Sequence, residues 1–495
     1  MPVSDQLKNQ HLLWRAGFGP AIYQLDDLNR TSPQKLYKAF QKASSKKPEY
    51  LQAADNYLQG LMMGFQEAGR QQRLEMSEEQ KKELRKRSRE GIRNLNLYWI
   101  NEMVSSDAQL REKMSFFWHG HFACRNLNIF FQQELLHVIR RNALGNFRDL
   151  LHDVSKTGAM LNFLNNNQNR KDHPNENFAR EVMELFTMGR GNYTEHDVKE
   201  AARAFTGWGA NAKGEFVFRK FQHDDASKTV LGKTGNFDGD EVLEILLDQR
   251  QTAKFISQKI YRFFVNDSID AQRVDWLAGR FYESDYDIGR LMEDIFTSDW
   301  FYDERNIGCK IKSPVELLVG IQRMLPMKLE NEEALLLLQR LLGQILFYPP
   351  NVAGWPGGKT WIDSSTLMMR MRIPQLINER DEFNIKPKAD DDQMMGRNDD
   401  DIKTGSDNNL SSGMQGRVGK AGRPINAEID WSKYVGYYNS VPRADLVNDI
   451  AGNLLQTKKT VSADIINEYS DADDKESFIK TATIQIMSTP EYQLC

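Results

Sequence analysis

The stretch Asp172-His-Pro-Asn-Glu-Asn-Phe-Ala-Arg-Glu-Val-Met-Glu-Leu-Phe-Thr-Met-Gly189 is the most informative part of the sequence for both fold and chemistry. Pro174 or Asn175 stands where a helix should begin, and Gly189 stands where one should end. Between these signals the apolar residues recur at helical spacing. They are Phe178, Val182, Leu185 and Phe186. The stretch therefore predicts a loop that runs into one amphipathic helix.

The polar face of this predicted helix carries an unusual density of reactive side chains. Glu176, Arg180 and Glu184 share a face because they are four residues apart, and Asn177 and Glu181 lie beside them. An arginine and a second carboxylate can push two carboxylate pKa values apart, which would suit a general acid and base. The same pattern also suits a buried ion-pair network that only stabilises the helix.

The rest of the chain is predicted to be mainly α, as a large multi-helix domain. The 495 residues are 40% hydrophobic and 27% charged, as in globular proteins. Apolar residues recur at helical spacing through most of the sequence. Near 210–235 the pattern changes to a short strand-like run between glycines, which predicts a small β-hairpin excursion.

Composition predicts three segments. Residues 1–384 form the main helical domain, and residues 429–495 form C-terminal helices that pack on it. Between them, residues 385–428 are rich in Asp, Gly, Asn and Ser and contain almost no large apolar side chain. Such a segment cannot bury enough apolar surface to order itself, so we expect a disordered insertion.

Charge and hydropathy exclude several classes of partner. The formal net charge is −4, so no overall basic field would attract nucleic acid or an anionic membrane, and nucleic acid is not expected as a partner. No stretch approaches the roughly twenty apolar residues of a membrane span. The cysteines at 124, 309 and 495 are too far apart for a zinc-thiolate motif.

Several motifs resemble those of a bacterial family known as domain of unknown function 1800. They are Trp14-Arg-Ala-Gly-Phe-Gly19, Glu112-Lys-Met-Ser-Phe-Phe-Trp-His-Gly-His-Phe-Ala123, Asn175-Glu-Asn-Phe-Ala-Arg-Glu181, Tyr193-Thr-Glu with residues 201–208, Lys312-Ser-Pro-Val-Glu316 and Pro349-Pro-Asn-Val-Ala-Gly-Trp-Pro-Gly-Gly358. The resemblance runs from about residue 8 to 375, and Ser488-Thr-Pro-Glu-Tyr-Gln493 fits the family's C-terminal pattern. It implies no particular reaction.

The resemblance does imply a partner and a location. Members of the family are often exported and often encoded beside a sulfatase-like protein of the domain of unknown function 1501 family, which is therefore the expected partner. The N-terminus of this chain, from Met1 to His11, lacks a basic segment followed by an apolar one, so no signal peptide is expected. By default that places the chain in the cytoplasm, in contrast to its exported relatives.

The motif His119-Gly-His121 predicts a site for a divalent transition metal, because imidazole is a good ligand for such ions. On a continuous helix the two rings would point about 200° apart. A helix that ends at Gly120 would remove this obstacle by turning His121 back. Further ligands would come from elsewhere, and the candidates are Glu176, Glu181, His173 and His223 with Asp224. The alternative is that both histidines are structural and cap the end of a helix.

Two functional hypotheses follow. The first is a metal-dependent enzyme with His119 and His121 as ligands and with Glu176, Arg180 and Glu181 as catalytic residues. The second is a non-catalytic scaffold that binds a partner protein through the loop around Trp355. The side chain of Trp355 could equally pack in the protein core. Five residues are expected to contribute binding contacts to the pocket. They are Asn175, Asn177, Trp208, His223 and Trp355.

Overall fold

The computed structural model describes residues 3–60, 77–211, 213–379, 427–457 and 461–495. The chain divides into two compact units. Unit 1 comprises residues 1–36, 302–350 and 356–495, and unit 2 comprises residues 37–301 and 351–355. The predicted insertion at 385–428 lies outside the described residues except for its last two positions, and so does the predicted boundary at residue 384.

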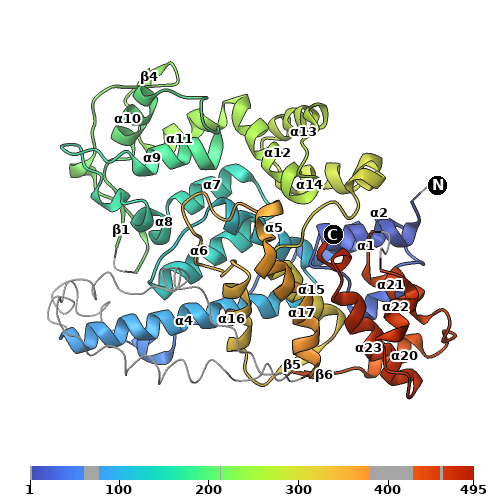
Figure 1. The fold of residues 1–495 in the computed structure, drawn as a ribbon. Helices are drawn as coiled ribbons and strands as arrows, with labels where there is room; N and C mark the ends of the chain where they lie inside the picture. The colour runs from blue at the N-terminus through green and yellow to red at the C-terminus, as the bar shows by residue number, and fades with distance from the viewer. Residues whose placement is uncertain (1–2, 61–76, 212, 380–426, 458–460) are drawn as a thin grey trace. The chain divides into compact units, whose positions relative to one another are not determined.

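Unit 2 is built mainly from helices, which confirms the predicted fold class (Figure 1). α4 (Glu78–Ser105), at 28 residues, packs against α5 (Gln109–His121) and α6 (Ile129–Asn142). Further helical segments of unit 2 that the structure describes in full are α7 (Phe147–Ser155), α8 (Gly158–Phe163), η2 (Asn166–Gln168), α9 (Asn177–Glu181), η3 (Val182–Thr187), α10 (Glu195–Ala204), η4 (Lys220–Gln222), α11 (Gly239–Leu247), α12 (Arg250–Phe264), α13 (Ala271–Glu283) and α14 (Ile288–Phe296). Two further elements, α2 (Pro33–Ser44) and η5 (Asp299–Tyr302), cross from one unit to the other.

The predicted β excursion is present in unit 2 as two short antiparallel hairpins. In the first, β1 (Trp208–Ala210) pairs with β2 (Phe216–Phe218), and Trp208 lies opposite Phe218. In the second, β3 (Lys228–Val230) pairs with β4 (Lys233–Gly235). Each hairpin is too small to be stable alone, so both depend on the helices they pack against. β3 packs on α10, and β1 packs on α8.

Unit 1 is also mainly helical. Among the residues that the structure describes, its elements are α1 (Asp5–Arg15), η1 (Ile22–Asp27), η6 (Glu304–Asn306), α15 (Pro314–Met324), β5 (Met327–Leu329), α16 (Glu333–Leu341), η7 (Gly358–Trp361), α17 (Ser364–Glu379), β6 (Ala427–Ile429), α20 (Ser432–Tyr438), α21 (Leu446–Leu454), α22 (Ala463–Glu468), α23 (Lys475–Met487) and η8 (Glu491–Gln493). In its core the fully buried Lys312 ammonium lies 3.8 Å from the ring centroids of both Trp14 and Tyr492. Stacking on two rings compensates part of the cost of burying this charge.

Local capping signals set several helix starts as the sequence predicts. α2 begins at Pro33, directly after Ser32, whose hydroxyl accepts from the Lys35 amide. α10 begins after Thr194, which forms a capping box with Asp197. In the described parts of the chain, no helix is both long enough and apolar enough to cross a membrane.

Candidate functional site

The two histidines of the predicted metal motif lie on one continuous helix. α5 runs through Gly120 and includes His121, so the expected helix end at Gly120 is wrong. Glycine costs a helix only about 1 kcal/mol, and the buried aromatic residues on either side of Gly120 offset that cost. The two imidazoles therefore point to different sides of α5. His119 lies 5.2 Å from the Trp99 ring and 5.6 Å from the Trp355 ring, between ring centroids.

His121 uses both ring nitrogens in contacts within the protein. The Lys259 ammonium, which can only donate, lies 3.1 Å from Nδ1, so Nδ1 accepts. Nε2 lies 3.2 Å from the Phe186 carbonyl oxygen and must carry the proton that it donates there. The ring is therefore neutral. Burial, together with the charge of Lys259, keeps the pKa of His121 well below its usual value. Burial, followed by the charge of Arg262, lowers the pKa of Lys259 to about 8.

The helix predicted at 175–189 is present only in part. α9 covers five residues and is followed directly by η3, a turn of π-helix over Val182–Thr187. The wider turn leaves main-chain carbonyls free to accept from other elements. The Leu185 carbonyl accepts from Lys259 at 3.0 Å, and the Phe186 carbonyl accepts from His121. The π-turn thus ties the opening stretch of the sequence to α5 and α12.

The π-turn also changes the predicted polar face. Arg180 contacts Glu176 at 3.0 Å and Glu195 at 2.7 Å, whereas Glu184 accepts from Tyr193 at 2.8 Å instead of facing Arg180. Glu181 is half-buried, and burial followed by the charge of Glu184 raises its pKa. Glu176 and Arg180 belong to an ion-pair network at the surface. Such a pair typically contributes under about 1 kcal/mol to the free energy of unfolding.

The histidines and the glutamates are not brought together as metal ligands. Among the residues that the structure describes, no three His, Cys, Asp or Glu side chains are grouped so as to hold a metal ion. The roles of His119 and His121 as ligands, and those of Glu176, Arg180 and Glu181 in catalysis, stay predictions.

Three of the five expected binding residues lie in or beside the core of unit 2. Trp208 is buried against Phe178, Phe205 and Phe216. His223 is buried, and its Nδ1 lies 2.9 Å from the Thr206 carbonyl oxygen. The Trp355 loop lies against α5, because a Cβ built on Gly354 would meet the Gly120 carbonyl and the Trp355 ring lies 5.6 Å from that of His119.

The two asparagines have local roles. The Asn175 side chain accepts from the Asn177 amide at 3.0 Å, which forms a turn before α9. The Asn175 amide donates to the Asn169 side chain at 2.9 Å. Asn177 itself is exposed at the start of α9. Their contribution to binding stays a prediction.

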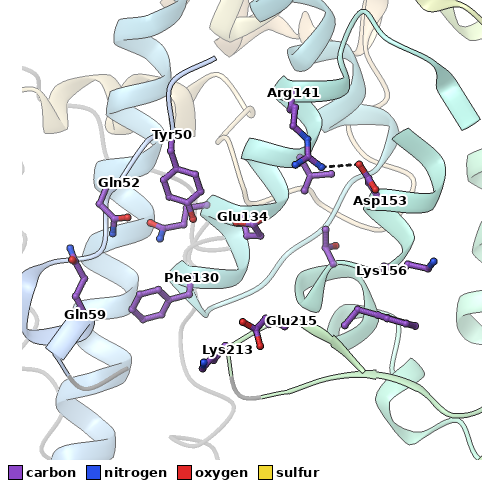
Figure 2. Close-up of a pocket in the computed structure, with 15 residues that line it drawn as sticks. Tyr50, Gln52, Gln59, Phe130, Glu134, Arg141, Asp153, Lys156, Lys213 and Glu215 are labelled. Carbon is purple, nitrogen blue, oxygen red and sulfur yellow. Dashed lines mark hydrogen bonds and ion pairs between the residues drawn. The ribbon is translucent and has the colours of Figure 1, made fainter. Parts of the chain in front are cut away.

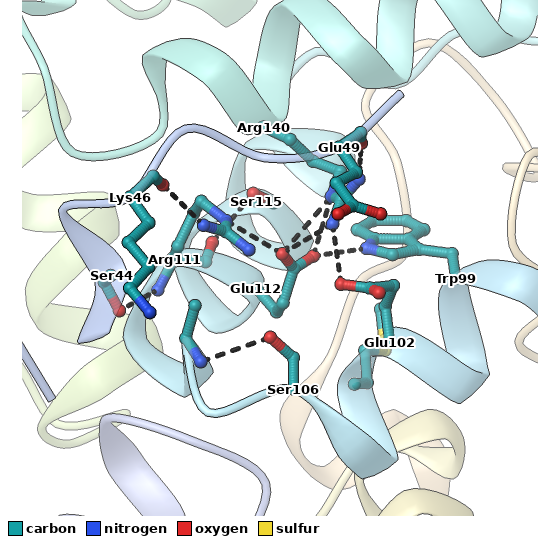
Figure 3. A network of polar contacts seen from close by, with 12 residues as sticks. Ser44, Lys46, Glu49, Trp99, Glu102, Ser106, Arg111, Glu112, Ser115 and Arg140 are labelled. Carbon is teal, nitrogen blue, oxygen red and sulfur yellow. Dashed lines mark hydrogen bonds and ion pairs between the residues drawn. The ribbon is translucent and has the colours of Figure 1, made fainter. Parts of the chain in front are cut away.

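A buried charge network joins α4, α5 and α6 (Figure 3). It includes Trp99, whose ring contacts that of His119. The Glu112 carboxylate is fully buried and accepts from Arg140 at 2.9 Å, from Arg111 at 2.9 Å and from the Trp99 indole at 3.0 Å. Arg140, only 1% exposed, also contacts Glu102 at 2.9 Å and the Glu49 carbonyl at 2.8 Å. Because the hydrogen bonds of Glu112 and Arg140 join side chains of different helices, the network holds α4, α5 and α6 in one arrangement.

A cleft of about 610 Å³, which we call the Tyr50 cleft, opens on unit 2 (Figure 2). Four separate segments line it: the chain before α4, α6, the α7–α8 junction and the β1–β2 hairpin. The lining residues are Tyr50, Gln52, Gln59, Phe130, Gln133, Glu134, Val138, Arg141, Asp153, Lys156, Thr157, Lys213, Gly214, Glu215 and Phe216. Polar and aromatic groups from distant parts of the sequence therefore converge on one open site.

Tyr50, Gln133 and Glu134 all line the Tyr50 cleft. The Ala53 amide donates to the Gln133 side-chain oxygen at 3.2 Å, which fixes the Gln133 side chain in the wall of the cleft. Burial, with the charge of Glu134, raises the pKa of Tyr50. Tyr50 is nevertheless 39% exposed toward solvent.

Most of the cations in the Tyr50 cleft are already neutralised. Arg141 contacts Asp153 at 2.8 Å. Lys156 contacts Asp240 at 2.7 Å, and its ammonium lies 5.4 Å from the Phe216 ring. The lining also contains two carboxylates, Glu134 and Glu215, and one further cation, Lys213. The cleft therefore offers hydrogen-bonding groups without a net positive field.

The hairpin wall of the cleft depends on a close approach of two glycines. A Cβ built on Gly158 would lie 2.6 Å from the Gly214 Cα, so any side chain there must displace the hairpin. We expect Gly158→Ala to lower the free energy of unfolding by about 1–3 kcal/mol, measured by urea denaturation. The control is Gly279→Ala on α13, where no atom lies within 4 Å; it should leave stability unchanged or raise it by up to about 1 kcal/mol. Equal effects of the two substitutions would contradict the close approach.

Sequence reasoning missed the Tyr50 cleft altogether. Its lining residues share no local motif, because the cleft forms only when four segments come together. The one available signal was the alternation at 215–223, which correctly placed Glu215 and Phe216 on a hairpin.

Comparison with known proteins gives one match. The family model described as "Protein of unknown function (DUF1800)" matches residues 11–494, which is nearly the whole chain. No curated protein and no solved structure matches the chain.

Proposed function

We propose that this chain, which belongs to the family described as proteins of unknown function DUF1800, binds a neutral, hydroxyl-rich ligand of the oligosaccharide class in the Tyr50 cleft. The observation that carries the proposal is the combination of aromatic rings, amides and carboxylates around one open cleft whose cations are mostly paired. Each of these three features favours the same class of ligand.

Three aromatic rings supply apolar faces. Tyr50 is exposed, while Phe130 and Phe216 are half-buried in the lining. Sugar rings present flat C–H faces that stack on such side chains, and an aromatic ring gives a large contact area at low entropic cost. Rings from the segment before α4, from α6 and from the hairpin can contact one ligand from several sides.

Amides and carboxylates supply the hydrogen bonds. Gln52 and Gln59 can both donate and accept, and the Glu134 and Glu215 carboxylates accept from hydroxyl groups. A hydroxyl-rich ligand can form hydrogen bonds with all four of these side chains. A phosphorylated or strongly acidic ligand would face two carboxylates with only Lys213 to offset them, so it is disfavoured.

Substitution of Tyr50 tests the proposal. A stacking ring contributes roughly 0.5–1.5 kcal/mol beyond its buried area, so we expect Tyr50→Ala to weaken oligosaccharide binding about tenfold. Binding is screened on a glycan array with the full chain and then measured by calorimetry. The matched control is Tyr98→Ala, at a 43% exposed tyrosine of α4 that does not line the cleft; it should bind like the unsubstituted protein.

Two results would overturn the proposal. One is that no oligosaccharide binds the unsubstituted protein at millimolar concentration. The other is that Tyr50→Ala and Tyr98→Ala bind a ligand equally well while both retain the thermal unfolding of the original chain. Thermal unfolding is included because it separates loss of binding from loss of fold.

A further inference from the structure

A projecting turn on unit 2 carries two exposed phenylalanines. Phe221, on η4, is 73% exposed, and Phe218, at the end of β2, is 41% exposed. A side chain that is 73% exposed cannot lie at the bottom of a groove, so Phe221 stands out from the surface. A single exposed apolar residue is common, but neighbouring ones rimmed by polar side chains often mark a contact with something outside the chain.

The turn is held firmly, so its exposed rings do not result from a loose loop. The Arg219 amide donates to the Gly207 carbonyl at 2.8 Å before the turn. After the turn, the buried His223 contacts Thr206, and the Asp224 amide donates to the Thr206 hydroxyl at 2.8 Å. Both ends of the turn are therefore anchored to the main body of unit 2.

Three exposed cations accompany the phenylalanines. Lys220 precedes Phe221 directly, and Arg170 and Lys171 belong to a neighbouring turn. The two turns are side by side, because the Lys171 amide donates to the Gln222 carbonyl at 2.8 Å. Within the described parts of the chain none of these three cations forms an ion pair, although Arg219 nearby turns inward to the Ala210 carbonyl.

We propose that these five residues, Phe218, Phe221, Arg170, Lys171 and Lys220, form a patch that docks on the surface of an anionic lipid bilayer. We call them the Phe221 patch. Phe221 enters the boundary between headgroups and acyl chains, while the cations contact lipid phosphates. This binding surface goes beyond the proposed oligosaccharide site, and neither depends on the other.

The geometry favours a bilayer over other anionic partners. An exposed ring on a turn suits a soft surface that it can enter, whereas a peptide or a nucleotide base is held better by a groove or by successive stacking platforms. The chain as a whole carries a charge of −4, so attraction must be local. Exposed carboxylates within four residues of the patch are Asp172, Glu215 and Asp225. Glu215 lines the Tyr50 cleft, which leaves Asp172 and Asp225 beside the three cations.

Co-sedimentation of the full chain with lipid vesicles tests the patch. Vesicles of equal parts phosphatidylglycerol and phosphatidylcholine should bind the protein, and vesicles of phosphatidylcholine alone should bind it much less.

We expect Phe221→Ser to reduce partitioning about tenfold. The triple variant Arg170→Gln, Lys171→Gln, Lys220→Gln should remove the dependence on salt. The control is Trp276→Ser, at a 45% exposed side chain of α13, which should partition like the original protein.

Three results would overturn the proposal. The first is the absence of binding to anionic vesicles. The second is equal partitioning of the Phe221→Ser and Trp276→Ser variants. The third is binding of single-stranded oligonucleotides, but not of vesicles, that is lost in the triple variant; this would make the patch a nucleic-acid surface. Oligosaccharide affinity, measured on the same variants, should be unchanged.

Discussion

Glu112→Gln should lower the free energy of unfolding by about 3–5 kcal/mol, because it removes the buried carboxylate that Arg111 and Arg140 share, which the partly exposed Glu102 beside Arg140 replaces only in part. Glu112 is fully buried, and Arg140 is 1% exposed. The carboxylate accepts from Arg140, Arg111 and Trp99 at 2.9–3.0 Å. A glutamine keeps the size of the side chain but removes the negative charge. The measurement is urea denaturation followed by circular dichroism.

A surface ion pair of similar length gives the matched control. Asp153 contacts Arg141 at 2.8 Å, but the two side chains are 41% and 49% exposed. Solvent screens such a pair, so Asp153→Asn should cost under about 1 kcal/mol. If Glu112→Gln and Asp153→Asn cost the same, the network does not hold α4, α5 and α6 as inferred.

A double substitution separates the effect of the network's charges from the effect of its hydrogen-bond geometry. Replacing both Glu112 and Arg140 by methionine removes one buried charge of each sign, while Arg111 and Glu102 keep theirs, so it should cost less than Glu112→Gln alone if desolvation of the Glu112–Arg140 pair dominates. A double variant that is as unstable as the single variant would indicate that the geometry of the hydrogen bonds to Trp99 and Glu49 matters more than charge.

The sequence predicts those parts of the fold that local chemistry decides. Ser32 with Pro33, and Thr194 with Asp197, start helices because a side-chain oxygen caps free amides, which requires only neighbouring residues. The mainly α fold class and the β excursion near 210–235 are predicted by the periodicity of apolar residues, which is also a local signal. The pairing of β5 with β6, between Met327–Leu329 and Ala427–Ile429, was not predicted, because it joins segments about a hundred residues apart.

Two local errors changed the view of the predicted site. No sequence rule identifies the π-turn at Val182–Thr187, which depends on Lys259 and His121 occupying the carbonyls it frees. Gly120 does not end α5, because aromatic packing around the helix outweighs the low helix propensity of glycine. Both errors concern tertiary contacts. The Tyr50 cleft was missed for the same reason, since its four segments meet only in the folded chain.

The protein should lose stability as the pH falls below neutrality, and His119 should account for much of the loss. Burial lowers the pKa of His119 to about 3, from the value of about 6.5 expected in the unfolded chain. Between these values the unfolded chain binds a proton that the folded chain does not bind. Protonation therefore favours unfolding, and stability declines from about pH 6.5 down to about pH 3. From about pH 7.5 to about pH 5, His119 alone should cost about 2 kcal/mol.

A variant without a titrating group at this position isolates the contribution of His119. His119→Gln cannot gain the proton, so the slope of unfolding free energy against pH should be shallower than in the original chain, whatever the absolute stability of the variant. The slope should not vanish, because burial also keeps the pKa of His121 well below its usual value. Urea denaturation at a series of pH values gives both slopes. Equal slopes would show that His119 takes up no extra proton on unfolding, contrary to its burial between Trp99 and Trp355.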